Sequence, residues 1–392
     1  MQLDDLRQAA TEHIRVEVAR GRATCAMIVA GTAEYLHGAG EPADLCDLAW
    51  ELVPGAFAAH LEAQARWPDR TDSDRLTDAF RALDAAGIVA REDFTCCRSC
   101  GVNDIGAEVP DGSPAHGYVF YHEQDAGRAA VGGSLWLAFG MFDQQSSARA
   151  GEQIAAALRA EGLQVDWNGS PDQRIQVPLG WARRRHGRLA AFPPDRPVGR
   201  TAKVQFLPDQ HRVYPPMSVA ALASLELPWL ADDTAVRVDD GDRTVTIRRE
   251  RHRLVADDGR VAGRFEGLRL LGEGDPGGAV PDEPGLIEVT FSCLPSGAQQ
   301  HANRPMDLPE IIDVLRRMPT RTDSWLSAEH DAGCVQMRWE NGRLWLETPN
   351  PADSSSTGKF ASLDEAERML TILATQNRNA VADLDGVTTK PW

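Results

Sequence analysis

Apolar residues recur at the spacing of helix turns in the N-terminal part of the chain. Further helices are predicted over residues 24–36 and 43–65, with a break or kink where Pro54 and Gly55 interrupt the second of them. Another helix is predicted to begin at the capping-box sequence Thr71–Asp74. The apolar face of the first helix consists of Leu3, Leu6, Ala10, Ile14 and Val18. The N-terminal region is therefore predicted to be helical.

Shorter apolar runs follow and are separated by turn residues. Strands are predicted over residues 117–122 and 134–139, and an alanine-rich helix over residues 147–161. Two more short strands, 163–167 and 174–178, are predicted on either side of a turn. Strands and helices in this order predict a small α+β sheet that is covered by helices.

The second half of the chain has a different pattern, in which short alternating runs flank turn sequences. The strongest hairpin signal is the pair of runs 334–339 and 343–347 on either side of Asn341-Gly342. Trp339 and Trp345 lie on these two runs, and we expect them to belong to the core. The two helices predicted in this half cover residues 308–317 and 362–375. This half is predicted to be an antiparallel sheet with helices.

The chain is expected to fold as two domains, because its 392 residues exceed the usual size of one. A proline-rich stretch over residues 190–200 has the composition of a linker. We therefore predict a first domain at residues 1–189, made of the helical region and the cysteine-bearing sheet, and a second domain at residues 201–392. The predicted fold class of the whole chain is α+β.

The charge of the chain argues against two classes of partner. The formal net charge is −17, whereas nucleic acids and anionic membranes attract proteins with a positive face. No apolar run approaches the roughly 18 residues of a membrane span, and the first residues lack the pattern of a secretory signal. We expect a cytoplasmic protein that binds neither nucleic acid nor membrane. Its oligomeric state is not predicted.

The densest group of reactive side chains is a cysteine cluster. Cys96, Cys97 and Cys100 fall within five residues, and the last two form a CxxC motif, a spacing that lets two thiolates bind one zinc ion. Because the cytoplasm keeps thiols reduced, such a cluster indicates a metal, catalytic or redox site. His122 is the preferred fourth zinc ligand because it follows a predicted strand, and His116 is the second choice. Cys25 and Cys46 would need helix packing to reach the cluster, and we expect both to be buried as small apolar residues.

A thiol-based reaction is the alternative to a structural zinc site. Cys97 or Cys100 would then act as nucleophile or redox sensor, with His122 as the base. Thioredoxin-like CxxC motifs begin a helix that follows a strand, where the thiol pKa is lowered. The sequence here predicts a cluster that follows a helix and lies on a loop, which favours zinc. Asp125 is expected to cap a short helix after His122.

Other motifs do not complete a catalytic site. The GxGxxG match at residues 272–277 is followed by a proline-containing stretch that cannot supply the helix a dinucleotide site needs. No Gly-x-Ser-x-Gly elbow occurs. The basic run Arg183–Arg188 is expected to be a solvated face that pairs with local carboxylates. These observations favour a protein that is not an enzyme, although they leave that question open.

Four segments resemble an uncharacterised family of actinobacterial proteins. They are the helix from Leu76 with the segment that follows it, the FxCCxxCG sequence at residues 94–101, the GYVFYHxQD sequence at residues 117–125, and the later GLxVxW sequence at residues 162–167 with RIxV at residues 174–177. The likeness covers about residues 70–187 and implies a domain of unknown function. The second half is only faintly similar to chaperone-like or immunity-type α/β domains.

Together these features predict a binding or adaptor protein, immunity-like or chaperone-like, with a structural zinc site at Cys96, Cys97, Cys100 and His122. Its acidic surface would bind a basic protein partner.

Overall fold

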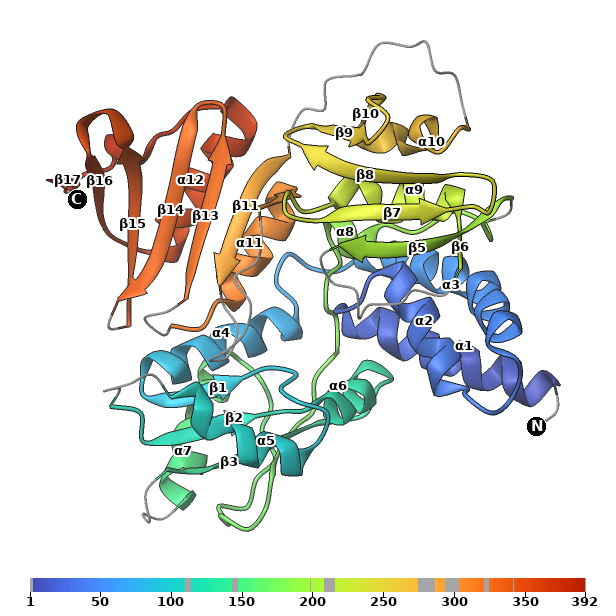
Figure 1. The fold of residues 1–392 in the computed structure, drawn as a ribbon. Helices are drawn as coiled ribbons and strands as arrows, with labels where there is room; N and C mark the ends of the chain where they lie inside the picture. Colours follow the sequence, from blue (N-terminus) through green and yellow to red (C-terminus); the bar gives the residue numbers. More distant parts are fainter. Residues whose placement is uncertain are drawn as a thin grey trace. The chain divides into compact units, whose positions relative to one another are not determined.

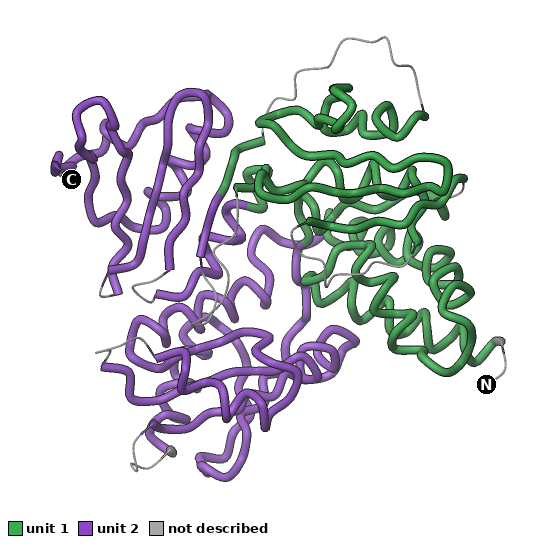
Figure 2. The backbone as a smooth tube through the Cα atoms, viewed as in Figure 1, with its two compact units in different colours: residues 1–65, 185–289, 302–310 green, residues 66–184, 290–301, 311–392 purple. Residues whose placement is uncertain are grey.

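The computed structural model describes most of the chain as an α+β protein (Figure 1). Its backbone contacts gather into two compact units (Figure 2). Unit 1 comprises residues 1–65, 185–289 and 302–310, and unit 2 comprises residues 66–184, 290–301 and 311–392. The described residues are 3–109, 114–142, 147–197, 199–207, 216–273, 286–292, 303–320, 324–340 and 342–391.

The units combine segments that are distant in the sequence. The N-terminal helices group with residues 185–289, whereas the cysteine-bearing residues 66–184 group with the C-terminal part of the chain. The chain passes from unit 2 to unit 1 between Arg184 and Arg185. A linker at residues 190–200, at which the chain would separate into two folding parts, stays a prediction.

Three helices begin unit 1, and local signals fix where they start. The Thr24 side chain accepts a hydrogen bond from the Met27 backbone N–H at 3.3 Å and so caps the second helix. The third helix begins at a proline and continues through Pro54, so of the expected break or kink the structure excludes the break. The three helices are α1 (Leu3–Arg20), α2 (Cys25–Tyr35) and α3 (Pro42–Gln64).

A six-stranded antiparallel sheet completes the core of unit 1. Its strand order is β10-β9-β8-β7-β5-β6, and pairs such as Val236 with Ile247 alternate with exposed positions along the central strands. These residues share one apolar cluster with Ile14 of α1 and Phe57 of α3. The strands are β5 (Thr201–Leu207), β6 (Met217–Ser218), β7 (Ala235–Asp239), β8 (Thr244–Glu250), β9 (Arg253–Ala256) and β10 (Val261–Gly263). The unit also contains α8 (Gly187–Ala190), α9 (Val219–Leu225), α10 (Gly267–Leu270) and β12 (Arg304–Met306).

The first sheet of unit 2 has the order β1-β2-β3-β4 and carries the cysteine segment. Its first two strands are parallel and the others antiparallel. Phe80 and Ile154, from two helices, pack on Val119 and Leu137 of the sheet. The strand predicted at residues 163–167 is reduced to a single bridge from Asp166. The elements are α4 (Asp72–Ala85), β1 (Ile88–Arg91), α5 (Arg98–Asp104), β2 (Gly117–Phe120), α6 (Glu123–Ala130), β3 (Leu135–Met141), α7 (Ser147–Ala160) and β4 (Ile175–Val177).

The second sheet of unit 2 is antiparallel and is covered by a C-terminal helix. The helix begins at the predicted capping box of Ser362 and Glu365. Trp339 and Trp345 are both buried, as predicted, but they lie on opposite faces of the sheet because Trp345 pairs with Arg338. The elements are β11 (Ile287–Ser292, the last three residues in unit 2), α11 (Leu308–Arg317, the first three residues in unit 1), β13 (Trp325–His330), β14 (Gly333–Glu340), β15 (Arg343–Asn350), β16 (Ser355–Ala361), α12 (Leu363–Gln376) and β17 (Thr388–Pro391). The predicted turn residue Asn341 lies outside the described residues.

The basic run is not the solvated face that the sequence predicts. Arg183 and Arg185 are buried, with 7% and 1% of their surfaces exposed. Arg183 pairs with Glu92, and Arg185 donates to the backbone carbonyls of Val18, Ala23 and Leu189. A guanidinium can be buried in this way because its five N–H groups find acceptors without a solvent shell.

Candidate functional site

The cysteine segment follows β1 through a strained loop. Asp93 and Thr95 have left-handed backbone conformations, with φ of 50° and 60°. A β-branched residue in this region costs on the order of 1–3 kcal/mol, and such strain gathers at functional sites. The Phe94 N–H donates to the Tyr121 carbonyl at 2.8 Å, and the Glu123 N–H donates to the Thr95 carbonyl at 3.1 Å. These bonds fix the loop beside the end of β2.

Three thiols come together at the end of this loop. The Cys100 Sγ lies 3.6 Å from the Sγ of Cys96 and 3.6 Å from the Sγ of Cys97. All three sulfurs are within 4.8 Å of one another, and among the described residues they form the group of ligating side chains close enough to share a metal ion. Cys96 is exposed, whereas Cys97 and Cys100 are partly buried. The segment can therefore present three sulfurs to one ion.

Gly101 permits this arrangement through packing. A Cβ atom at this position would lie 2.3 Å from the ring of Phe120 on β2. The backbone of Gly101 is helical within α5, so close packing and not a turn conformation accounts for the glycine. The absence of a side chain lets the first turn of α5 lie against the sheet.

The predicted setting of the cluster is wrong. The cluster follows the strand β1 and begins the helix α5, with Cys97 at the N-cap position and Cys100 in the first turn. The helix is short and polar, so it gives no apolar periodicity that a sequence pattern could detect. The argument that favoured zinc over dithiol chemistry, which depended on a loop setting, no longer holds.

The two thiols of the CxxC motif differ in acidity. The backbone N–H of Cys100 donates to the Cys97 sulfur and lowers the pKa of Cys97, and the thiols of Cys100 and Cys96 lower it further. The same contacts with Cys97 and Cys96 raise the pKa of Cys100 to about 11. Of these two thiols, Cys97 therefore ionises more readily, and both metal binding and nucleophilic attack require a thiolate.

His122 lies at the end of β2 in a buried polar group. Its Nε2 is 2.9 Å from the Oδ2 of Asp125, and only 3% of its surface is exposed. Its Nδ1 is buried and has no hydrogen-bond partner. Burial lowers the pKa of His122, although Asp125 opposes this effect. A neutral ring that donates from Nε2 to Asp125 keeps a lone pair on Nδ1.

Asp125 does not cap the helix as the sequence predicts. It is fully buried within the first turn of α6, forms ion pairs with Arg128 and Arg174, and contacts the Nε2 of His122. The N-cap position belongs to His122, with no side-chain cap bond. Sequence reasoning missed Arg174 because it is 49 residues from Asp125 and no local pattern connects the two.

The remaining sequence candidates lie elsewhere. His116 Nε2 is 3.3 Å from Gln153 Oε1, and His116 is not in the three-sulfur group. Cys25 and Cys46 belong to the apolar core of unit 1, as predicted, and burial raises the pKa of both. Most of the GxGxxG match and Cys293 lie outside the described residues.

His122 is likewise not in the three-sulfur group. Its role as fourth ligand stays a prediction. The hydrogen bond from Nε2 leaves Nδ1 as the atom through which His122 would coordinate.

Residues 3–185 match the family described as Domain of unknown function (DUF6891). The predicted resemblance to an uncharacterised domain family is thereby confirmed, and the match includes the helices before residue 70 as well as the cysteine cluster and His122. No curated protein and no solved structure matches the chain. None of the described helices is long and apolar enough to cross a membrane.

Proposed function

We propose that Cys96, Cys97 and Cys100 bind one zinc ion through their thiolates and that the protein is a metal-stabilised binding protein. The observation that supports this is the spacing of the sulfurs. Zinc–sulfur bonds of about 2.3 Å in a tetrahedron separate neighbouring sulfurs by about 3.8 Å, and both closest pairs here are 3.6 Å apart. A disulfide would need about 2.05 Å.

His122 is the fourth ligand in this proposal. Zinc-binding histidines commonly donate their second ring N–H to a carboxylate, which fixes the ring and increases its basicity. The contact of His122 Nε2 with Asp125 has this form, and it keeps Nδ1 for the metal. The backbone hydrogen bond from Glu123 to Thr95 holds the residue after His122 against the residue before Cys96.

The partner in this proposal is a basic protein. A net charge of −17 favours encounter with positively charged surfaces and disfavours acidic ones. Zinc would then act on the fold, by joining the strained loop to α5 and to the end of β2, and not on a substrate.

Metal analysis of protein purified without chelator tests the zinc site. We expect about one zinc per chain in the wild type, loss of that zinc in Cys97→Ser, and lower thermal stability of the variant, because the folding free energy includes the binding free energy. Cys334→Ser is the matched control, since Cys334 lies on β14 and is absent from the three-sulfur group, and it should keep its zinc. A wild-type chain without metal would contradict the proposal.

A dithiol redox protein is the second candidate, supported by the position of Cys97 at the start of α5 and by its lowered pKa. The Cys97 thiolate would attack a substrate disulfide and displace one thiolate. Cys100 would then attack Cys97, release the reduced substrate and leave a Cys97–Cys100 disulfide for an external thiol to reduce. In the same experiment, metal-free protein whose Cys97 is alkylated much faster than Cys334 would favour this candidate.

A further inference from the structure

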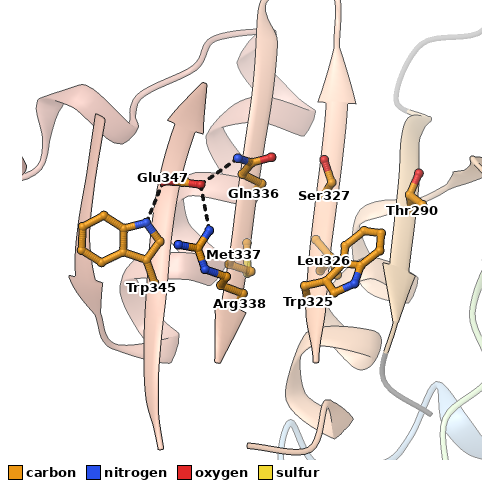
Figure 3. Close-up of a pocket in the computed structure, with 9 residues that line it drawn as sticks. All are labelled: Thr290, Trp325, Leu326, Ser327, Gln336, Met337, Arg338, Trp345 and Glu347. Carbon is orange, nitrogen blue, oxygen red and sulfur yellow. Dashed lines mark hydrogen bonds and ion pairs between the residues drawn. The ribbon is translucent and has the colours of Figure 1, made fainter. Parts of the chain in front are cut away.

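The second sheet of unit 2 contains a pocket of about 410 Å³, and Figure 3 shows the residues that line it. This volume falls within the range of about 300–1,000 Å³ that is usual for small-molecule sites. The helix α12 covers the other face of this sheet (Figure 1). Antiparallel register arranges the side chains of the pocket-lining face in two rows across the strands. The first row contains Trp325, Arg338 and Trp345, and the second contains Ser327, Gln336 and Glu347, with Thr290 of β11 beside Ser327 (Figure 3).

The charges that line this pocket are already paired. Glu347 accepts hydrogen bonds from Trp345 Nε1 at 2.7 Å, Gln336 Nε2 at 2.8 Å, Ser356 Oγ at 2.8 Å and Arg338 at 3.3 Å. These donors occupy the acceptor sites of the carboxylate. Arg338 also donates to Glu340 at 2.6 Å. A charged ligand would therefore have to compete with existing ion pairs, whereas an uncharged ligand would not.

Apart from Glu347, the second row consists of neutral hydrogen-bonding groups. Because the Gln336 Nε2 donates to Glu347, its Oε1 is turned away from Glu347 and toward Ser327 (Figure 3). This oxygen stands in line with the hydroxyls of Ser327 and Thr290. Neighbouring strands are about 4.8 Å apart, so a row across three strands extends over roughly 10 Å. An occupant of the pocket must carry several donors and acceptors along one edge.

Of the two indole rings that line the pocket, only that of Trp325 has a face that a ligand could contact. Trp345 is 5% exposed, with the Lys390 ammonium 4.0 Å from its ring centre on one side and the Phe360 ring against it at 5.1 Å. Trp325 is partly exposed and lines the pocket next to the neutral row. The pocket thus supplies one flat apolar surface and one polar edge.

We propose that this pocket binds an uncharged sugar, as a monosaccharide or disaccharide. The C–H face of a pyranose ring packs on Trp325, whose ring carries negative charge density on its face. The hydroxyls of the sugar pair with Gln336 Oε1, Ser327 and Thr290. The Ser327 hydroxyl contacts the Cys334 sulfur at 3.2 Å, which is a weak partner and leaves the hydroxyl able to form a further hydrogen bond. A nucleobase gains most when it stacks on both faces, and Trp345 cannot supply the second face.

Saturation-transfer NMR of the full-length protein with glucose, galactose, mannose, N-acetylglucosamine, maltose and cellobiose tests this proposal. Adenosine and uridine are the competing arm. We expect saturable transfer to at least one sugar and none to the nucleosides. Trp325→Ala should weaken binding about tenfold or more, whereas Trp325→Phe, which keeps a flat ring, should retain most of the affinity. Trp136→Ala is the matched control, because Trp136 lies on β3 with 36% of its surface exposed.

Three outcomes would overturn the proposal. They are no transfer to any of the six sugars, transfer to the nucleosides alone, and unchanged sugar affinity in Trp325→Ala. The thermal melting curve of each variant shows whether it is folded, and Trp325→Phe provides the test if Trp325→Ala is not.

Discussion

Glu92→Gln is expected to lower the free energy of unfolding by about 3–5 kcal/mol, the usual cost of removing one partner from a buried ion pair. The Glu92 carboxylate forms an ion pair with Arg183 and accepts a hydrogen bond from the Tyr121 hydroxyl at 2.9 Å. Arg317 of α11 also lies within electrostatic range of Glu92. The neutral amide would remove the ion-pair partner of the buried Arg183 guanidinium. Chemical denaturation of the two proteins at pH 7 measures the difference.

The same carboxylate makes stability depend on pH. Burial alone would raise the pKa of Glu92, but Arg183, Arg317 and the hydrogen bonds outweigh it and lower the pKa from 4.5 to about 2. Because the folded-state pKa is below the unfolded one, the stabilisation is complete above about pH 4.5 and is lost as the pH falls toward 2. A shift of this size corresponds to about 3 kcal/mol. The free energy of unfolding of the wild type should therefore fall by this amount in acid. Glu92→Gln should not show this decrease, because it has no carboxyl group at this position.

Asp383→Asn is the matched control for Glu92→Gln. Asp383 also pairs with an arginine of unit 2, Arg378, but both side chains are at least half exposed. Exposed pairs contribute about 0–1 kcal/mol. If Glu92→Gln were no more destabilising than Asp383→Asn, the ion pair and hydrogen bonds of Glu92 would contribute no more to stability than an exposed ion pair does.

Local signals account for what the sequence predicted correctly. The capping boxes at Thr71 and Ser362 satisfy backbone N–H groups within one helix turn, so three or four residues suffice to locate each helix start. The hairpin of β14 and β15 depends on alternation and a short turn, which are equally local. The buried states of Cys25 and Cys46 follow from apolar neighbours on the same helices.

Long-range contacts account for what the sequence could not predict. Arg183 and Arg185 look like solvated charges in a basic run, but they are buried against partners that include Glu92 and the Val18 carbonyl, which are far away in the sequence. The pairing of Asp125 with Arg174 has the same origin. The helix α5 escaped prediction for a different reason: its seven residues are too short and too polar to give a periodic signal. The grouping of the three cysteines was therefore predictable from the sequence, but their place between a strand and a helix was not.

Asp125→Asn is expected to change both the stability and the metal affinity of the cysteine site. Asp125 is fully buried and compensates Arg174, so its neutralisation should lower the free energy of unfolding by about 3 kcal/mol. The amide also no longer fixes His122 as a carboxylate does. Loss of such an outer partner typically weakens metal binding about 10-fold to 100-fold. Competition with a chromophoric zinc chelator measures the affinity.

Asp104→Asn separates this effect from a general loss of charge, because Asp104 is an exposed aspartate at the end of α5. It should leave both stability and zinc affinity unchanged. If Asp125→Asn were destabilised but bound zinc as tightly as the wild type, His122 would not be a ligand, and the three thiolates would share the ion with a group from outside the chain. A site of that kind has an open position, as catalytic zinc sites do. The zinc affinity of Asp125→Asn therefore distinguishes two forms of the proposed site. In one all four ligands belong to the chain, and in the other the fourth ligand is another molecule.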